Sequence, residues 1–288
     1  MSAVVFAAPG NRRRVPATTV VLHTLLIVGG LAMVFPFIWM ILTSLKTLPQ
    51  LLSEPLSLLP DPLTGENYPE ALSAMPFGRA YLNSVYIAGL IIAGTLVTAS
   101  MAGYAFARIP FRGSKALFIG FLATQMIPKQ VTLVPFYLLM SRLGWVDSHL
   151  ALIVPAMLAN PFAVFLMRQF VLSLPKELDE AATCDGAGPV RTFFAVVLPN
   201  LRPGLSALAI IVALDTWNNF LFPLVLLNST ELFTVPLLLA GFEGQHGGVN
   251  YGLVMAASAV STVPVLILFV IAQKRILNSM ATSGLGGR

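Results

Sequence analysis

Charged side chains are scarce in this sequence. Asp, Glu, Lys and Arg make up 10% of its 288 residues, whereas apolar residues make up 57%. A soluble domain carries about 25% charged residues, so this scarcity, with a mean hydropathy of +0.83, indicates an integral membrane protein. The formal net charge of +5 does not indicate a nucleic-acid partner, because the basic residues adjoin apolar runs instead of gathering on one face.

Several catalytic and nucleotide-binding sequence motifs are also missing. Neither H-E-x-x-H nor G-x-S-x-G occurs, so no catalytic constellation supports an intramembrane hydrolase or acyltransferase. The absence of G-x-x-x-x-G-K-[ST] excludes ATP hydrolysis in the P-loop manner by this chain, so energy from ATP must come from another subunit. Cys184 is the single cysteine, which excludes a disulfide framework and a cysteine metal cluster, and we interpret it as an inert loop residue.

Six apolar runs are predicted to cross the membrane. They lie at about 18–42, 81–106, 116–140, 149–170, 205–227 and 251–272. The first is too long for a signal peptide and lacks a clean cleavage site, so we expect a retained helix. Pro128 and Pro135 predict that the third span is broken or kinked. The expected parts are a cytoplasmic N-terminal segment (1–16), a six-helix transmembrane domain (17–273) and a cytoplasmic C-terminal tail (274–288).

The basic residues predict the orientation of these spans. Thirteen of the seventeen Lys and Arg residues fall on one side, three (Lys46, Arg79 and Arg142) fall on the other, and Lys129 falls within a span. Because Lys and Arg are enriched in cytoplasmic loops, both termini are expected in the cytoplasm. The acidic loops 46–80 and 228–250 are then expected on the outer face.

The stretch 175–204, between the fourth and fifth spans, predicts a helix, a sharp turn and a second helix. A proline at 175 precedes the acidic run Glu177–Glu180, which suits the first turn of a helix. Gly186 can take a positive φ and Pro189 can start a helix but not continue one. The second helix is expected to end at Pro199. Composition alone is equally consistent with an ordinary amphipathic connector.

Motifs in three places carry a resemblance to a known family. Residues 180–199 contain Glu180-Ala181-Ala182, then Asp185-Gly186-Ala187, then Leu198-Pro199, which resembles the "EAA … G … LP" loop of permease subunits in bacterial ABC importers. Residues 102–108 (AGYAFAR) and 217–224 (WNNFLFPL) resemble family signatures of the second and fifth helices. The resemblance covers nearly the whole chain and is closest to the second permease subunit of maltose-type carbohydrate importers.

The resemblance implies a fold and a set of partners. The fold would be an all-α membrane protein with six transmembrane helices, a type I ABC importer (MetI-like) permease bundle with a cytoplasmic coupling helix. The partners would be a second permease in a heterodimer, two ATPase subunits, an extracytoplasmic solute-binding protein and a carbohydrate solute, all at the inner membrane. This chain would bind no cofactor, since ATP and Mg²⁺ would sit on the ATPase. The residues that would couple this chain to the ATPase are Glu180, Ala181, Ala182, Asp185, Gly186, Leu198 and Pro199.

Charged and polar residues within the spans are candidates for the solute pathway. Lys129 and Asp215 lie at similar depths, where a charge is costly and is by default a functional hypothesis, so they are expected to face the interior and can pair. The pair either lines the pathway or only neutralises charge. Trp217, Asn218 and Asn219 suit a sugar through ring stacking and amide hydrogen bonds, and equally suit helix packing.

A self-contained secondary transporter that uses Lys129 and Asp215 is the alternative function. Such a transporter needs charged relays and usually an internal repeat. The sequence offers one candidate charge pair and no evident repeat, which favours the importer subunit.

Overall fold

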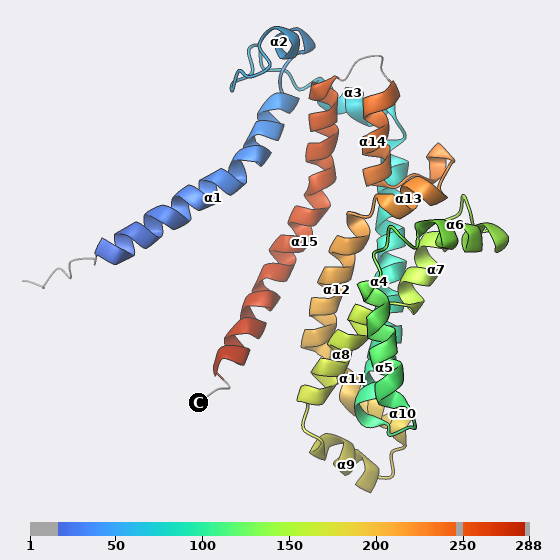
Figure 1. The fold of residues 1–288 in the computed structure, drawn as a ribbon. Coiled ribbons are helices and arrows are strands. Elements are labelled where there is room, and N and C mark those ends of the chain that lie inside the picture. The colour runs from blue at the N-terminus through green and yellow to red at the C-terminus, as the bar shows by residue number, and fades with distance from the viewer. Residues whose placement is uncertain (1–16, 246–249, 286–288) are drawn as a thin grey trace, which may run out of the picture.

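The computed structural model describes residues 17–245 and 250–285, which form helices joined by loops (Figure 1). The expected N-terminal segment 1–16 and the last three residues, 286–288, lie outside the described residues. The α-helices of the first half are α1 (Ala17–Ser44), α2 (Leu48–Ser53), α3 (Asn67–Ala74), α4 (Phe77–Arg108), α5 (Ser114–Ala123), α6 (Leu133–Arg142) and α7 (Leu150–Leu158). Those of the second half are α8 (Pro161–Ser173), α9 (Glu177–Cys184), α10 (Pro189–Thr192), α11 (Leu198–Asn200), α12 (Arg202–Trp217), α13 (Leu221–Leu226), α14 (Val235–Gln245) and α15 (Tyr251–Leu285).

The expected count of six spanning helices is confirmed only in part. Within the described residues, four helical stretches are long and apolar enough to cross a membrane: Thr18–Ser44, Phe77–Arg108, Leu150–Ser173 and Tyr251–Gln273. A fifth is obtained when the helices Pro189–Asn200 and Arg202–Trp217, which meet at 76°, are taken as one broken span.

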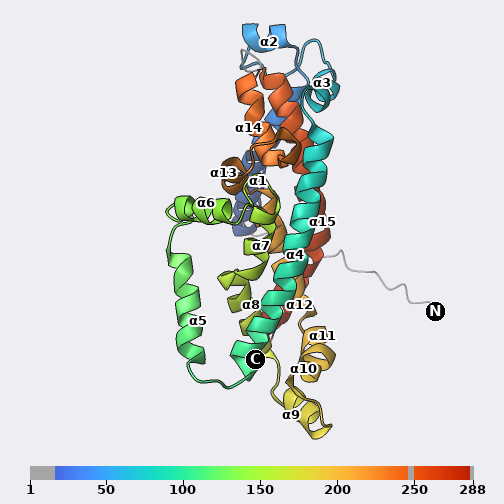
Figure 2. The ribbon, with the colours of Figure 1, turned by 90° about the vertical axis from the view of Figure 1, so that its right-hand side faces the viewer.

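The third predicted span, 116–140, is not one helix. It consists of α5, the 3₁₀ turn Thr124–Met126, an irregular stretch over 127–132, and α6, which runs across the end of α5 (Figure 2). Pro128 explains the break, because it lacks an amide hydrogen and disfavours helical backbone at the residue before it. The sequence therefore predicted the interruption correctly, although not the change of direction that follows it.

Helix α4 is the centre of the bundle and packs against α7, α8 and α12. Two glycines allow this contact. A Cβ atom on Gly94 would lie 2.6 Å from the Cβ of Met157, and one on Gly103 would lie 2.8 Å from the backbone nitrogen of Arg168. Small residues let helix backbones approach closely within a membrane. The surrounding core contains Ile87, Ile91, Ala99, Leu152, Ala163, Met167, Leu208 and Leu226.

One end of the molecule is closed by α2, α3, α14 and the start of α15 (Figures 1 and 2). The amide of Asn67 donates hydrogen bonds to the carbonyls of Ser44 and Lys46, both at 2.8 Å, and so fixes the end of α1 to α3. Below this point α1 leans away from the bundle (Figure 1), and its apolar window has no residue buried within the chain.

The opposite end carries the segment 175–204, which has the expected helix and turn. Helix α9 begins after Pro175, and Gly186 has a φ of +79° at the turn. The second helix was predicted to end at Pro199, and the helical stretch ends one residue later, at Asn200. The return arm runs through α10, the π-helical turn Phe193–Val197 and α11, and it bends at Leu201. Pro199 lies in the first turn of α11, where a proline is tolerated.

Candidate functional site

Three interruptions of the helices meet around one pocket of about 440 Å³. They are the stretch 127–132 before α6, the break at 159–160 between α7 and α8, and the break at 218–220 between α12 and α13. Backbone that is not helical is tolerated at membrane depth only where it is buried in protein or lines a water-filled cavity. The polar residues that line the pocket are Gln125, Lys129, Thr132, Asn160, Asp215, Thr216 and Asn219.

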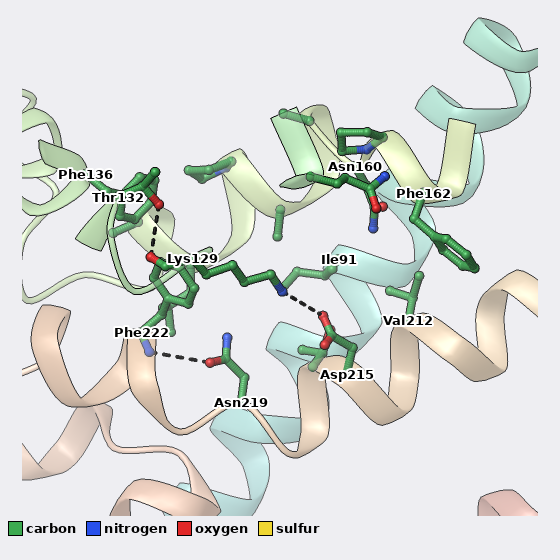
Figure 3. A pocket seen from close by; sticks show the side chains of 18 of the residues that line it. Ile91, Lys129, Thr132, Phe136, Asn160, Phe162, Val212, Asp215, Asn219 and Phe222 are labelled. Carbon is green, nitrogen blue, oxygen red and sulfur yellow. Dashed lines mark hydrogen bonds and ion pairs between the residues drawn. The ribbon is translucent and has the colours of Figure 1, made fainter. Parts of the chain in front are cut away.

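Lys129 and Asp215 face each other across this pocket. Figure 3 shows the lysine side chain reaching over the cavity to the aspartate of α12, with 3.8 Å between Nζ and Oδ2. The pairing considered from the sequence is therefore present. The two side chains are 70% and 74% exposed within the single chain. Neither charge is therefore enclosed by other atoms of this chain, and an exposed ion pair of this kind adds little to stability.

Two amides stand on the pocket walls with part of their hydrogen-bonding capacity in use. Asn160 caps α8 by accepting a hydrogen bond from the amide of Ala163 at 3.0 Å. Asn219 accepts one from the amide of Phe222 at 3.4 Å. In each case the side-chain oxygen is engaged, which leaves the NH₂ group to donate elsewhere. Both side chains are seen at the cavity in Figure 3.

Asn160 was missed in the sequence. The signal that could have identified it is the Asn-Pro dipeptide at 160–161, which marks a break inside an apolar run. The neighbouring wall is aromatic, since the rings of Phe136 and Phe222 meet edge to face at 5.4 Å between centroids. The pocket thus combines one cation, one anion, amides and aromatic rings, a set that can hydrogen-bond hydroxyl groups and pack against a sugar ring.

Trp217 and Asn218 are not brought to the pocket. The ring of Trp217 packs on Tyr81 of α4, 5.6 Å away between centroids. The amide of Asn218 donates to the carbonyl of Leu214 within its own helix. Residues two apart on a helix do not share a face, so Asp215 and Trp217 of α12 point in different directions. The packing interpretation therefore holds for Trp217, and Asn219 alone of this stretch lines the cavity.

The predicted coupling residues divide between two faces of the segment 175–204. Glu180, Ala181, Asp185, Gly186 and Pro199 are exposed. The Ala182 side chain is buried at 7% exposure, and Leu198 is half-buried. Helix α9 thus presents Glu180 and Ala181 outward, while Ala182 lets it sit close to the bundle. Within the described residues, no cluster of three or more His, Cys, Asp or Glu side chains suits a metal ion.

Spanning helices that are broken around a polar pocket are typical of membrane transport proteins. Comparison with known families makes this class specific. The chain belongs to the family described as "Binding-protein-dependent transport system inner membrane component", whose model matches residues 94–281. The family expected from the motifs is therefore confirmed.

Relatives match along most of the chain. The arabinooligosaccharides transport system permease protein AraQ of Halalkalibacterium halodurans is 37% identical, over 94% of this chain and 99% of the relative. The trehalose/maltose transport system permease protein MalG of Thermococcus litoralis is 36% identical, over 91% and 96%. A chain from a solved bacterial ABC transporter involved in alginate import superimposes with a TM-score of 0.79 at 23% identity, covering 93% of this chain and 99% of that one. This last likeness confirms the importer-permease fold.

Proposed function

We propose that this chain is one of two permease subunits of an ATP-driven importer for an oligosaccharide. The observation that carries the proposal is the pocket at the three helix breaks, with its exposed Lys129–Asp215 pair. Support for the solute class comes from relatives named for the transport of arabinooligosaccharides, trehalose and maltose, and diacetylchitobiose. The pocket chemistry agrees with a polyhydroxylated solute, because amides and charged groups bind hydroxyls.

The open side of the pocket is closed by the second permease in this proposal. Lys129, Asp215 and Asn219 then contact the solute directly from this subunit. The end of the molecule formed by α2, α3 and α14 (Figure 1) is the outer face in this proposal, and a solute-binding protein delivers the solute there. Both termini lie in the cytoplasm, as the distribution of basic residues supports.

Energy reaches the spans through the segment 175–204. This chain has no P-loop motif, so ATP and Mg²⁺ are bound by two separate ATPase subunits. Helix α9 docks on them with Glu180 as a charged contact, and Gly186 forms the turn behind it. Movement of the ATPases shifts α9, and the bend of 76° beyond Leu198 and Pro199 acts as the hinge to α12. The spans then rock between inward- and outward-open states.

Co-purification tests this function. The chain is expressed with the products of its neighbouring genes, extracted in detergent, and the associated proteins are identified by mass spectrometry. We expect a second permease, an ATPase and a binding protein to accompany it, and the complex in liposomes to import oligosaccharide only with ATP. Purification of the chain alone, with no ATPase bound, would overturn the proposal.

A secondary transporter is retained as a second candidate because of one observation, the ion pair of Lys129 and Asp215 at the helix breaks that line the pocket. The same liposomes separate the two functions. Solute uptake by the chain without ATP or partner subunits would establish the secondary transporter, and its absence would exclude it.

A further inference from the structure

Arg108 ends helix α4 and holds the end of a second helix. Its Nη2 atom donates hydrogen bonds to the carbonyl oxygens of Leu174, at 2.7 Å, and Val171, at 3.2 Å, at the C-terminal end of α8. The last carbonyls of a helix need partners, and a cation also suits the negative end of the helix dipole. The arginine side chain is 7% exposed, so these bonds are shielded from water.

The same side chain reaches the coupling helix. Arg108 Nε lies 3.1 Å from Oδ2 of Asp179 in α9, and the aspartate side chain is 21% exposed. The other oxygen, Oδ1, and the Nε atom of Arg108 are both buried without a hydrogen bond in the described chain, so the two side chains meet as an ion pair. The Tyr104 hydroxyl of α4 lies beside the same carboxylate. Glu177 and Glu180 of α9 are exposed. Asp179 is therefore the acid of α9 that turns toward the bundle.

Helices α4 and α8 are packed closely together at this level. Their backbones nearly touch at Gly103, where a Cβ atom would lie 2.8 Å from the backbone nitrogen of Arg168. Arg168 Nε also donates to the carbonyl of Phe106 at 3.3 Å. Helix α4 continues without a break to Ile91, which lines the pocket about 25 Å farther along the helix axis. A group fixed to Arg108 is thus fixed to the pocket wall.

The return arm of the segment meets the bundle differently. Phe193, Val197 and Leu201 form an apolar cluster with Tyr104 and Val171, and the rings of Tyr104 and Phe193 lie 5.3 Å apart. Apolar contact is not directional, so it holds the arm near the spans without fixing its direction of movement. The ion pair of Arg108 and Asp179 supplies the directional connection.

We propose that Arg108 is the positioning residue that makes α4 and α8 follow α9. The inference rests on the proposed function, in which α9 docks on an ATPase. Movement of α9 away from α4 would leave a buried arginine and a half-buried carboxylate unpaired, which is unfavourable. The helix pair therefore moves with α9, and the pocket wall moves with the helix pair.

The test compares Asp179→Asn with the wild type in the purified complex with its ATPases and binding protein. This variant removes the charge and leaves the bonds of Arg108 to α8 in place. We expect assembly and basal ATP hydrolysis to be unchanged, while binding-protein stimulation of hydrolysis and ATP-driven uptake fall on the order of tenfold. Asp179→Glu keeps the charge and is expected to restore a large part of both.

Arg108→Gln is expected to give the same loss, with lower thermal stability because α8 also loses its cap. Arg112→Gln is the matched control, since Arg112 is exposed in the loop after α4, and it should behave as the wild type. Full coupling in Asp179→Asn, or an equal loss in Asp179→Asn and Asp179→Glu, would overturn the inference. If the wild-type chain binds no ATPase, the proposed function fails instead, before any variant is compared.

Discussion

At the scale of single residues, the pair of Lys129 and Asp215 is the sharpest test of the pathway. Each charge can hydrogen-bond a solute hydroxyl, and a hydrogen bond to a charged group contributes about 1.5–3 kcal/mol, which corresponds to roughly 10- to 100-fold in affinity. We therefore expect Lys129→Met, Asp215→Asn and the double variant each to reduce uptake at least about tenfold. The reduction is measured by recording the uptake rate as a function of solute concentration, with equal amounts of assembled complex for each variant.

The double variant decides between the two roles of the pair. If the charges only neutralise each other, Lys129→Met abolishes uptake because it strands Asp215, and adding Asp215→Asn restores it. Restored uptake would contradict the pathway role. Arg142→Gln, at an exposed position outside the pocket, is the control and should transport normally.

Asp147 makes a separate prediction about pH. Its carboxylate accepts hydrogen bonds from the Ser229 hydroxyl at 2.5 Å and from the amides of Ser229, at 2.9 Å, and Asn228, at 2.8 Å. These bonds, those to Ser229 foremost, hold the pKa of Asp147 below its usual 3.8. A lowered pKa in the folded state means that the stabilisation is complete above about pH 4 and is lost as pH falls through the lower folded value.

We expect the melting temperature of the wild type to fall more steeply below about pH 4 than that of Asp147→Asn. Asparagine tolerates the positive φ of 58° at this position, so the variant changes the charge without straining the turn. Thermal denaturation of the detergent-solubilised complex at several pH values measures the difference. Parallel curves for the two proteins would refute the role of the carboxylate.

At the scale of elements, the turn behind α9 gives a prediction with a matched control. Gly186 has a φ of +79°, and a Cβ atom there would meet nothing within 4 Å. Gly186→Val therefore acts through backbone strain, which costs about 1–2 kcal/mol, and not through a clash. We expect the complex to insert and assemble, with less solute imported per ATP hydrolysed. Gly188, two residues on, has a φ of −75° and equally open surroundings.

Gly188→Val should consequently keep the wild-type ratio of solute imported to ATP hydrolysed. Both variants and the wild type are reconstituted in liposomes in the same way, and solute uptake and ATP hydrolysis are measured on the same samples. Equal ratios for Gly186→Val and the wild type would mean that the shape of this turn does not matter for coupling.

The elements also show what a single sequence determines. Helix α9 and its turn were predictable, because the proline, the acidic first turn and Gly186 act locally. That Lys129 and Asp215 lie at the same level of the bundle was also predictable, by counting residues along two predicted spans. The direction of α6 after Pro128 was not predictable, because a proline sets where a helix breaks and packing sets where the chain goes next. For the same reason, the direction of the Trp217 side chain was not predictable, because it depends on packing against Tyr81.

At the scale of the whole molecule, α2 and α3 lie at one end and α9 at the other (Figures 1 and 2). This separation makes the orientation in the membrane measurable. The single cysteine, Cys184, is exposed at the end of α9. If α9 faces the cytoplasm, a membrane-impermeant maleimide should label Cys184 in inside-out vesicles and leave it unlabelled in right-side-out vesicles.

The same cysteine reports whether α9 is covered by a partner. Labelling in inside-out vesicles should slow by at least about tenfold when the ATPase is present, since a docked surface excludes the reagent. Arg142→Cys in a Cys184→Ala background is the control. Arg142 is the exposed last residue of α6, on the predicted outer side, and a cysteine there should label only in right-side-out vesicles, whether or not the ATPase is bound. Labelling of Cys184 from the outer side would invert the topology, and with it the assignment of α9 as the contact with an ATPase.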